Sequence, residues 1–329
     1  MSNVLSSIFS ISFAASIIRI CVPILFAALA ASVTSKAGVA NIGLEGTMSL
    51  CALIAVTCAW KSGSAMVGVL GAMVLGVLLS LMIGFFAFKF KTDIILCGIA
   101  VNTLGEGGAV LLLYLLTGAK SDTQTVMGAW HLPKITIPLL SKIPVIGEIF
   151  FTDQSILTYV AFLCVLLMWI LLYKTPLGIR IRAVGENDHA ADSVGVGVYK
   201  IKYTSLIICG LLCGMAGAYM SMSYMAMFSK GMIAGRGFIA LAAQAMGRGE
   251  PLGVMLSSLL FGFAQALATY VKGTNLPAQL VDALPYVVTI LGITIYAAST
   301  YNKARKIHAR QEKKAKKKAY SLYGTYGKD

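Results

Sequence analysis

The sequence predicts an all-α polytopic membrane protein with about nine transmembrane helices, in a range of about eight to ten, arranged in two halves of inverted topology. Composition is the first reason, because 58% of the 329 residues are hydrophobic and only 12% are charged, whereas a soluble domain carries roughly 25% charged residues. The second is a succession of bilayer-length apolar runs. The third is a glycine-rich polar motif that interrupts these runs in each half.

The apolar runs follow one another along nearly the whole chain. They are Ile8–Val33, Ile42–Trp60, Ala65–Phe88, Ile94–Leu116, Ile156–Tyr173, Tyr203–Phe228, Leu252–Val271 and Val281–Ser299, with a shorter one at Phe238–Met246. The first run lacks a basic leading region and a small-residue cleavage site, so we expect a retained helix rather than a signal peptide. We therefore expect one transmembrane domain over residues 1–300 and a separate tail over 301–329.

Basic residues indicate how the chain is oriented. The net charge is +14, and the tail contains the run Lys313–Lys318. A basic tail after the last span is typical of a cytoplasmic anchor that contacts anionic lipid, with a nucleic-acid-binding arm as the alternative. The basic segments Lys174–Lys202 and Lys89–Lys91 are also expected in the cytoplasm, and the mixed-charge connection Ala119–Ser155 outside. Alternation then places the N-terminus outside and the C-terminus in the cytoplasm.

Two regions share a layout that suggests an inverted repeat. Ser35-Lys36 precedes the glycine-rich stretch Gly38–Gly46, and Ser229-Lys230 precedes Gly231–Gly237; both lead into an apolar segment. We expect a first repeat at about 8–118 and a second at about 203–299, joined through a loop at 174–202. In transporters with such repeats, the substrate path lies near the midplane between interrupted helices.

The strongest candidates for a polar path are two pairs of an amide and a carboxylate. Asn41 and Glu45 are one helical turn apart, as are Asn102 and Glu106. Charged groups at membrane depth are costly and are expected only beside protein or a water-filled path. Either pair therefore lines a path or ties helices together, and the Asn102–Glu106 pair, in mid-span, is the better candidate for facing a substrate.

Further path candidates are Met48, Phe238, Gln244 and Gln265. An uncharged amide can hydrogen-bond a polar neutral solute without the desolvation cost of a charge. Phe238 follows a flexible glycine motif, where a ring can stack on a substrate or act as a gate. Interhelical hydrogen bonding for the glutamines and ordinary packing for Phe238 are the alternatives.

The segment Thr175–Gly195 is too long for a tight turn. Asn187 or Asp188 can cap a short helix that runs through Ala190-Ala191 and stops at Gly195. Small residues on such a helix suit docking into a groove of another protein, and a solvated connector is the alternative.

Other chemistry has little support. The seven cysteines lie mostly in apolar runs without a CxxC pair, and the three histidines, His131, His189 and His308, are far apart. We expect no disulfide framework, no metal site and no enzymatic triad. A phosphate-binding Gly-x-x-x-x-Gly-Lys-Ser/Thr motif is missing, since Gly118-Ala119-Lys120-Ser121 lacks the required glycine before lysine. We expect no cofactor on this chain.

Three motifs in order carry a family resemblance. Val39–Gly46, the loop from Thr175 to Gly195, and Gly235–Ala240 with Gly247 and Pro251 resemble the ribose-type permeases of bacterial ABC importers, which have a type II importer-like fold. Within them the chain is most similar to the nucleoside-importer branch, which is paired with basic membrane lipoprotein receptors. The resemblance covers roughly 17–298. It excludes the basic tail, and this chain lacks the additional N-terminal span of longer relatives.

The resemblance implies a permease in the bacterial cytoplasmic membrane that moves nucleosides, purine nucleosides above all, by alternating access. Its partners would be a second homologous permease, an extracytoplasmic lipoprotein binding protein and separate cytoplasmic ATPases, which would bind ATP and Mg. The loop would be the coupling helix. Its candidate residues are Arg180, Arg182, Gly185, Glu186, Asn187, Ala190, Ala191 and Gly195.

Two other functions stay open at this point. The first is a permease for ribose or another simple sugar in the same type of system. The second is an ion-coupled secondary transporter, in which Glu45 or Glu106 carries the proton and the Arg180–Gly195 loop is a plain connector.

Overall fold

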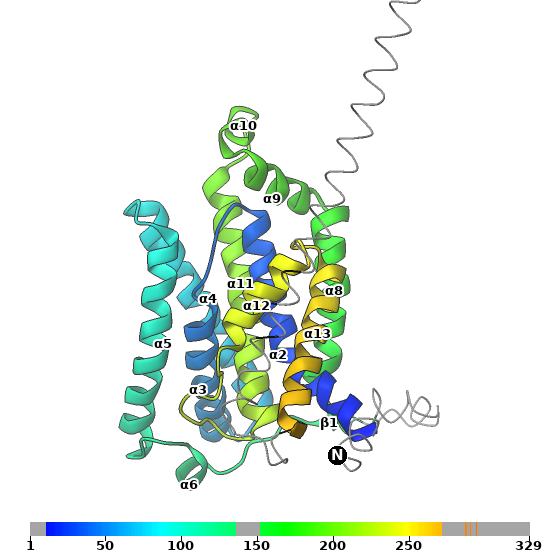
Figure 1. The fold of residues 1–329 in the computed structure, drawn as a ribbon. Helices are drawn as coiled ribbons and strands as arrows, with labels where there is room; N and C mark the ends of the chain where they lie inside the picture. Colours follow the sequence, from blue (N-terminus) through cyan, green and yellow to red (C-terminus); the bar gives the residue numbers. More distant parts are fainter. Residues whose placement is uncertain (1–10, 136–151, 272–286, 288–289, 291–293, 295–329) are drawn as a thin grey trace, which may run out of the picture. The chain divides into compact units, whose positions relative to one another are not determined.

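The structure is a computed structural model that describes residues 11–135 and 152–271, together with positions 287, 290 and 294. The described helices and strands, shown in Figure 1, are α2 (Ile11–Lys36), α3 (Leu44–Ser62), α4 (Ala65–Lys89), α5 (Ile94–Thr117), α6 (Gln124–Met127), β1 (Lys134–Ile135), β2 (Gln154–Ser155), α8 (Ile156–Lys174), α9 (Pro176–Glu186), α10 (Asp188–Ser193), α11 (Val198–Tyr219), the π-helical turn η1 (Met220–Tyr224), α12 (Arg236–Met246) and α13 (Pro251–Val271). They belong to the first of two compact units, Met1–Pro285 and Tyr286–Asp329.

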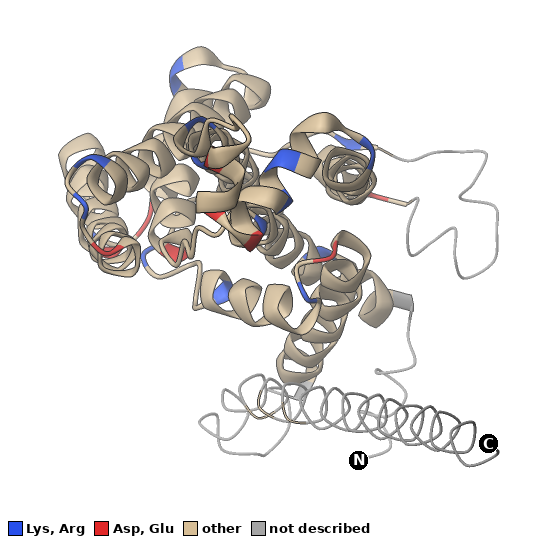
Figure 2. Cartoon of the chain, turned by 90° about the horizontal axis from the view of Figure 1, so that it is seen from above, with Lys and Arg blue, Asp and Glu red and all other residues tan. Residues whose placement is uncertain are grey.

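Six described helices are long and apolar enough to cross a membrane. They are Ser12–Lys36, Ala65–Lys89, Ile94–Thr117, Ile156–Lys174, Val198–Tyr224 and Pro251–Tyr270. They confirm six of the predicted runs, with ends shifted by a few residues. Figure 2 shows that acidic and basic residues are few on these helices, as expected for segments in hydrocarbon. The predicted run Val281–Ser299 and the basic tail lie outside the continuous described residues.

Two predicted runs form helices that are not among these six. The run Ile42–Trp60 becomes α3, which has 19 residues and starts after an irregular stretch. The short run becomes α12, which has 11 residues. At 1.5 Å per residue α12 extends about 16 Å, roughly half the thickness of the hydrocarbon layer. Both helices begin directly after a glycine-rich interruption of the apolar pattern.

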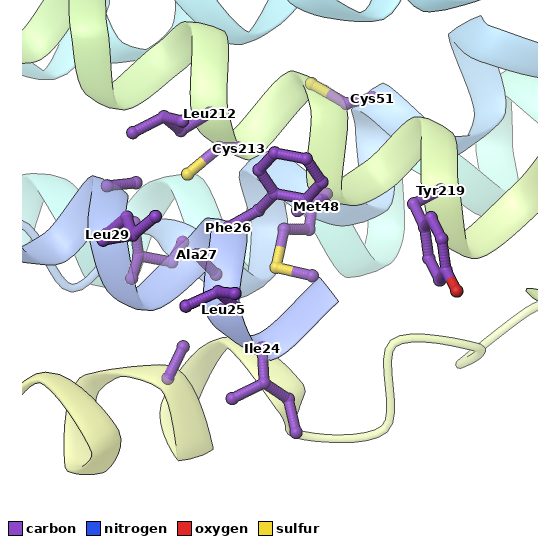
Figure 3. Close-up of a cluster of buried hydrophobic side chains, with 14 of the residues drawn as sticks. Ile24, Leu25, Phe26, Ala27, Leu29, Met48, Cys51, Leu212, Cys213 and Tyr219 are labelled. Atoms are coloured by element: carbon purple, nitrogen blue, oxygen red, sulfur yellow. The ribbon is translucent and has the colours of Figure 1, made fainter. Parts of the chain in front are cut away.

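The core is built around α2, which packs against α8, α11, α12 and α13. Figure 3 shows Phe26 and Leu29 of α2 among Met48 of α3 and Leu212 and Cys213 of α11, all buried. In a membrane, helices associate through close van der Waals packing and small residues rather than through exclusion of water. The alanines, cysteines and glycines of these helices fit that mode of packing.

The two ends of the bundle differ in structure. At one end α9 and α10 follow α8; α6 and β1, which pairs with β2, lie at the other end (Figure 1). A π-helical turn such as η1 is an uncommon feature that often marks a functional position. The irregular segment between η1 and α12 lies at the α6 end, because its backbone bonds to residues 121–130.

Candidate functional site

The first turns of α3 and α12 meet at Glu45. The Oε1 atom of Glu45 accepts a hydrogen bond from the Gly235 N–H at 2.7 Å, and Oε2 accepts one from the Gly237 N–H at 2.6 Å. The side chain is buried, with an exposed fraction of 6%. A helix N-terminus has unpaired N–H groups and a positive partial charge, so it is a favourable place for a carboxylate. Glu45 thus acts as a cap for α12 supplied by a different helix.

Gly237 brings the two backbones into direct contact. A Cβ at this position would lie 2.6 Å from the Glu45 nitrogen and 2.7 Å from its Oε2. The guanidinium of Arg236 turns away, since it donates to the carbonyls of Met232 and Ile233 at 3.1 Å and lies over the Tyr224 ring. Among the described residues, no ion pair joins Arg236 to Glu45. The carboxylate of Glu45 therefore accepts its hydrogen bonds from backbone N–H groups.

Asn102 of α5 holds the first turn of α3 from the other side. Its Oδ1 accepts from the Gly46 N–H at 2.9 Å, and its Nδ2 donates to the Ile42 carbonyl at 2.9 Å. The helices touch here, because a Cβ at Gly105 would overlap the Cα of Gly46. Asn102 thus has the geometry of an interhelical clamp, one of the two roles that the sequence left open.

Asn41 is also used within the fold. Its Oδ1 accepts from the Gly43 N–H at 2.9 Å, which shapes the turn before α3, and its Nδ2 lies 3.4 Å from Cys209 Sγ of α11. Both asparagines predicted for the path, like Glu45, are therefore engaged in hydrogen bonds within the chain itself.

A cavity of about 330 Å³ opens beside Glu45. This volume is at the lower end of the range of roughly 300–1,000 Å³ typical of small-molecule sites. One wall is made by α3 and α5 and the other by the segment that precedes α12. The lining residues are Glu45, Ser49, Glu106, Ala109, Val110, Phe228, Lys230, Gly231, Ile233, Ala234 and Gly235. Two carboxylates and one ammonium group thus share a cavity that is partly open at the surface of an apolar bundle.

The other path candidates lie elsewhere. Met48 has an exposed fraction of 0% and belongs to the core of Figure 3. Phe238 is 51% exposed on α12 but does not line the cavity. Gln244 lies near the end of α2, because a Cβ at Gly249 would be 3.1 Å from Lys36 Cε and 3.3 Å from Gln244 Nε2. Gln265 is partly buried on α13. The structure therefore brings together only Glu45 and Glu106 of the predicted set.

Ser49, Phe228 and Lys230 line the cavity but are not among the path residues predicted from the sequence. Lys230 lies in the Ser229-Lys230 motif that defined the second half of the repeat, so a charged residue next to a helix interruption was an available signal. Ser49 and Phe228 had no comparable signal, because a serine or a phenylalanine in an apolar run is also typical of ordinary packing.

At the other end of the bundle, α10 is capped on both sides. The Asn187 side chain accepts from the Ala190 N–H at 3.0 Å, and Gly195 beyond the helix has φ +80°. This confirms the predicted cap and stop. Asp188 accepts from Lys202 Nζ at 3.2 Å, and this hydrogen bond lowers the pKa of the Asp188 carboxyl. This ion pair joins the first turn of α10 to Lys202 of α11.

The coupling-helix candidates divide into packed and accessible residues. Ala191 is buried, and Gly185 contacts α2 so closely that a Cβ would overlap the Lys36 carbonyl oxygen. The Arg182 guanidinium lies 4.9 Å from the centroid of the Tyr173 ring. The remaining candidates, Arg180, Glu186, Asn187, Ala190 and Gly195, are exposed. Next to them Val194 is 78% exposed, which makes this end partly apolar on its surface.

Membrane-length helices, two helices that start at interruptions, and a polar cavity between those starts define a multi-pass membrane protein of the permease class. The chain belongs to the family described as the permease component of the branched-chain amino acid transport system, whose model matches residues 13–293.

Individual relatives agree with this assignment. The guanosine ABC transporter permease protein NupQ of Bacillus subtilis (strain 168) is 35% identical over 284 residues, which are 83% of this chain and 88% of the relative. The nucleoside ABC transporter permease protein NupC of Lactococcus lactis subsp. cremoris (strain MG1363) is 33% identical over 285 residues, with the same shares.

A solved structure supports the fold alone. The structure described as PsaBC from Streptococcus pneumoniae in complex with Fab has a TM-score of 0.51 and 14% identity. The match covers 88% of this chain and 94% of that chain. The family expected from the sequence is confirmed by the family model and the two relatives, and this structural likeness adds support for the overall fold only.

Proposed function

We infer that this chain is the permease subunit of an ABC importer that carries nucleosides, purine nucleosides above all, into the cytoplasm by alternating access. The observation that carries this proposal is the 35% identity to a guanosine permease over 83% of the chain. The solute passes unchanged, and ATP with Mg binds to separate ATPase subunits.

The cavity supports a path at the junction of α3, α5 and α12. It combines polar groups with a glycine-rich wall, as recognition of a hydrogen-bonding solute requires. Glu106 is exposed in the middle of α5. A charged residue facing lipid at a helix centre costs about 2.5–3.5 kcal/mol on insertion scales. A second, homologous permease covering this face removes that cost and places the path between the two subunits.

The topology follows the charge pattern. The α9–α10 end and the C-terminus are cytoplasmic in the bacterial cytoplasmic membrane, and the α6 end faces a lipoprotein binding protein. About nine spans form one domain over residues 1–300, with inverted repeats at about 8–118 and 203–299 around a loop at 174–202. The tail 301–329 contacts anionic lipid.

The helix α10 is the surface on which an ATPase docks. Its caps make it a rigid short helix, and Ala190 on it and Val194 directly after it are accessible. Ala190→Trp tests this role better than a substitution at Gly185, because Gly185 is packed against α2. We expect Ala190→Trp to abolish uptake at normal protein levels. Unchanged uptake would remove the docking assignment.

The test of the function is uptake of labelled guanosine, adenosine and uridine, with ribose as the comparison. It is measured in cells with and without this gene, and with the ATPase disabled by substitution of its nucleotide-binding lysine. Loss of nucleoside uptake in both backgrounds is the expected result. Gene-dependent uptake of ribose alone would indicate a sugar permease. Uptake indifferent to the ATPase would favour an ion-coupled carrier that uses Glu45 or Glu106.

A further inference from the structure

The wall of the cavity that precedes α12 is attached differently from the wall made by α3 and α5. Residues 228–235, here called the gate segment, contribute Phe228, Lys230, Gly231, Ile233, Ala234 and Gly235 to the lining. None of the described helices or strands includes these residues. The opposite wall consists of helical residues on α3 and α5, which are clamped together by Asn102. One wall is therefore rigid, and the other is a stretch of backbone without regular secondary structure.

Backbone hydrogen bonds fix the gate segment at its outer end. Thr123 N donates to the Phe228 carbonyl at 3.0 Å, Lys230 N donates to the Ser121 carbonyl at 2.8 Å, and Phe228 N donates to Thr123 Oγ1 at 3.0 Å. Asp122 and Ser229 face each other across this short antiparallel bridge. The gate segment is thus attached to the loop before α6 by hydrogen bonds, without a close glycine contact of the kind that joins Gly46 and Gly105 in the other wall.

Glu45 fixes the gate segment at its inner end. Its two oxygens bond to N–H groups on either side of the point where α12 begins. Gly237 belongs to the first turn of α12, whereas Gly235 precedes the helix. The bond to Gly237 can persist while the bond to Gly235 breaks. A single carboxylate thus joins the rigid helix start to the segment that leads into it.

The backbone between these attachments has the conformation of a hinge. Ala234 has φ +51° and Gly235 has φ +78°, two consecutive left-handed residues directly before α12. For a residue with a Cβ, this conformation costs about 1–2 kcal/mol. Residues held in such conformations cluster at switches, where the surrounding contacts maintain them. The conformation in the structure therefore stores strain at Ala234 that the Glu45 and Thr123 bonds hold in place.

We propose that residues 228–235 are a gate that closes the cavity toward the α6 end, and that Glu45 is the positioning residue that latches it. The structure shows the latched state. In the transport cycle, the bond between Glu45 and Gly235 and the bonds between residues 228–230 and 121–123 break, the gate turns about Ala234–Gly235, and the cavity opens toward the side where α6 lies. This role rests on the proposed transport function and gives Glu45 no direct contact with the solute.

A disulfide across the bridge tests the movement. The bonds that flank Asp122 and Ser229 make them a non-hydrogen-bonded antiparallel pair, with Cα atoms about 4.5 Å apart, a distance that a disulfide can span. In the assembled transporter, oxidised Asp122→Cys/Ser229→Cys is expected to lose guanosine uptake and to regain it on reduction. Full cross-linking with unchanged uptake would overturn the proposal.

The chain offers a matched control at the same end of the bundle. Lys134 and Ser155 are paired in β1 and β2, and Ile156 N donates to the Pro133 carbonyl, so this is also a non-hydrogen-bonded pair. Oxidised Lys134→Cys/Ser155→Cys ties two strands together without touching the gate segment. Its uptake should be the same oxidised and reduced. An equal loss in this pair would show that any cross-link at this end is harmful and would overturn the specific role of residues 228–235.

Accessibility of the cavity is the second measurement, and it does not depend on uptake. Ser49→Cys, in a Cys58→Ser background, places a thiol in the cavity wall, and a membrane-impermeant thiol reagent is added to intact cells. Glu45→Gln should raise the labelling rate, because an amide offers only one acceptor oxygen to the two N–H groups, and Glu45→Asp should raise it less. Equal rates in all three proteins would overturn the latch. If guanosine uptake never depends on the chain, the proposed function fails instead, whereas normal uptake with invariant labelling removes only the gate.

Discussion

The starts of α3 and α12 have a similar sequence layout but different mechanical properties. Both follow a Ser-Lys pair and a glycine-rich stretch. The start of α3 is fixed by Asn102 and by the contact of Gly46 with Gly105, where the backbones themselves touch. The segment before α12 is held at its inner end by Glu45 and passes through two left-handed residues. The same motif thus builds a rigid wall in one half and a hinged one in the other.

The largest effect is expected at Gly105, where the close contact between α3 and α5 requires a residue without a side chain. Gly105→Leu would force a side chain into the Cα of Gly46, and the backbone has no room to yield. The cost should exceed the ~1–3 kcal/mol usual for overpacking and leave little folded protein. Gly107→Leu is the matched control on the same helix, since nothing lies within 4 Å of a Cβ there. Yield in detergent and the melting temperature report the difference, and equal behaviour of the two variants would contradict the rigid contact.

A smaller loss is expected when the clamp is removed without adding bulk. Asn102→Ala leaves the Gly46 N–H and the Ile42 carbonyl without their partner, at about 1–3 kcal/mol for a buried polar group. The melting temperature should fall, while uptake per folded molecule stays constant. A drop in uptake per molecule in Asn102→Ala would show that this amide also meets the solute.

Glu106 tests whether the rigid wall contacts the solute. It lines the cavity and has no resolved hydrogen bond or ion pair among the described residues, so Glu106→Gln should not affect folding. Loss of a charge-assisted hydrogen bond of about 1.5–3 kcal/mol would lower uptake at low substrate by roughly tenfold or more. Thr103→Val, one turn earlier on the exposed side of α5, serves as the control. Uptake equal to that of the control would show that Glu106 does not contact the solute and that its role is confined to the subunit interface.

The sequence allowed prediction of the helices and of their polar interruptions. Apolar runs of bilayer length have few alternatives to helix in a membrane, because each backbone group must be bonded within its own segment. A local cap such as Asn187 is also predictable, since donor and acceptor are three residues apart. That the Glu45 carboxylate requires a partner is predictable as well, because a charge at membrane depth is costly unless protein or water surrounds it.

The identity of that partner was not predictable. Glu45 bonds to the backbone of Gly235 and Gly237, about 190 positions away, and N–H groups have no side-chain signature. The burial of Met48 was equally hidden, because a helix that is apolar all round does not show which face meets the core. Contacts between helix starts that are far apart in the sequence, such as those of α3 and α12, are therefore identified only from the three-dimensional structure.

The smallest effect in the comparison is expected at Ala234. Ala234→Gly removes the penalty of a positive φ, but the more flexible glycine also favours the unfolded chain, so the net change in stability should stay below about 1 kcal/mol. Because the strain belongs to the closed gate, its relief should slow labelling of Ser49→Cys slightly, and Ala234→Val, with a branched Cβ, should speed it. Ala226→Gly provides the control, since Ala226 has φ +61° but lies outside the gate segment. Faster labelling in Ala234→Gly, or an equal change in Ala226→Gly, would show that the strain at position 234 does not drive opening and that the two helix starts differ only in how tightly they pack.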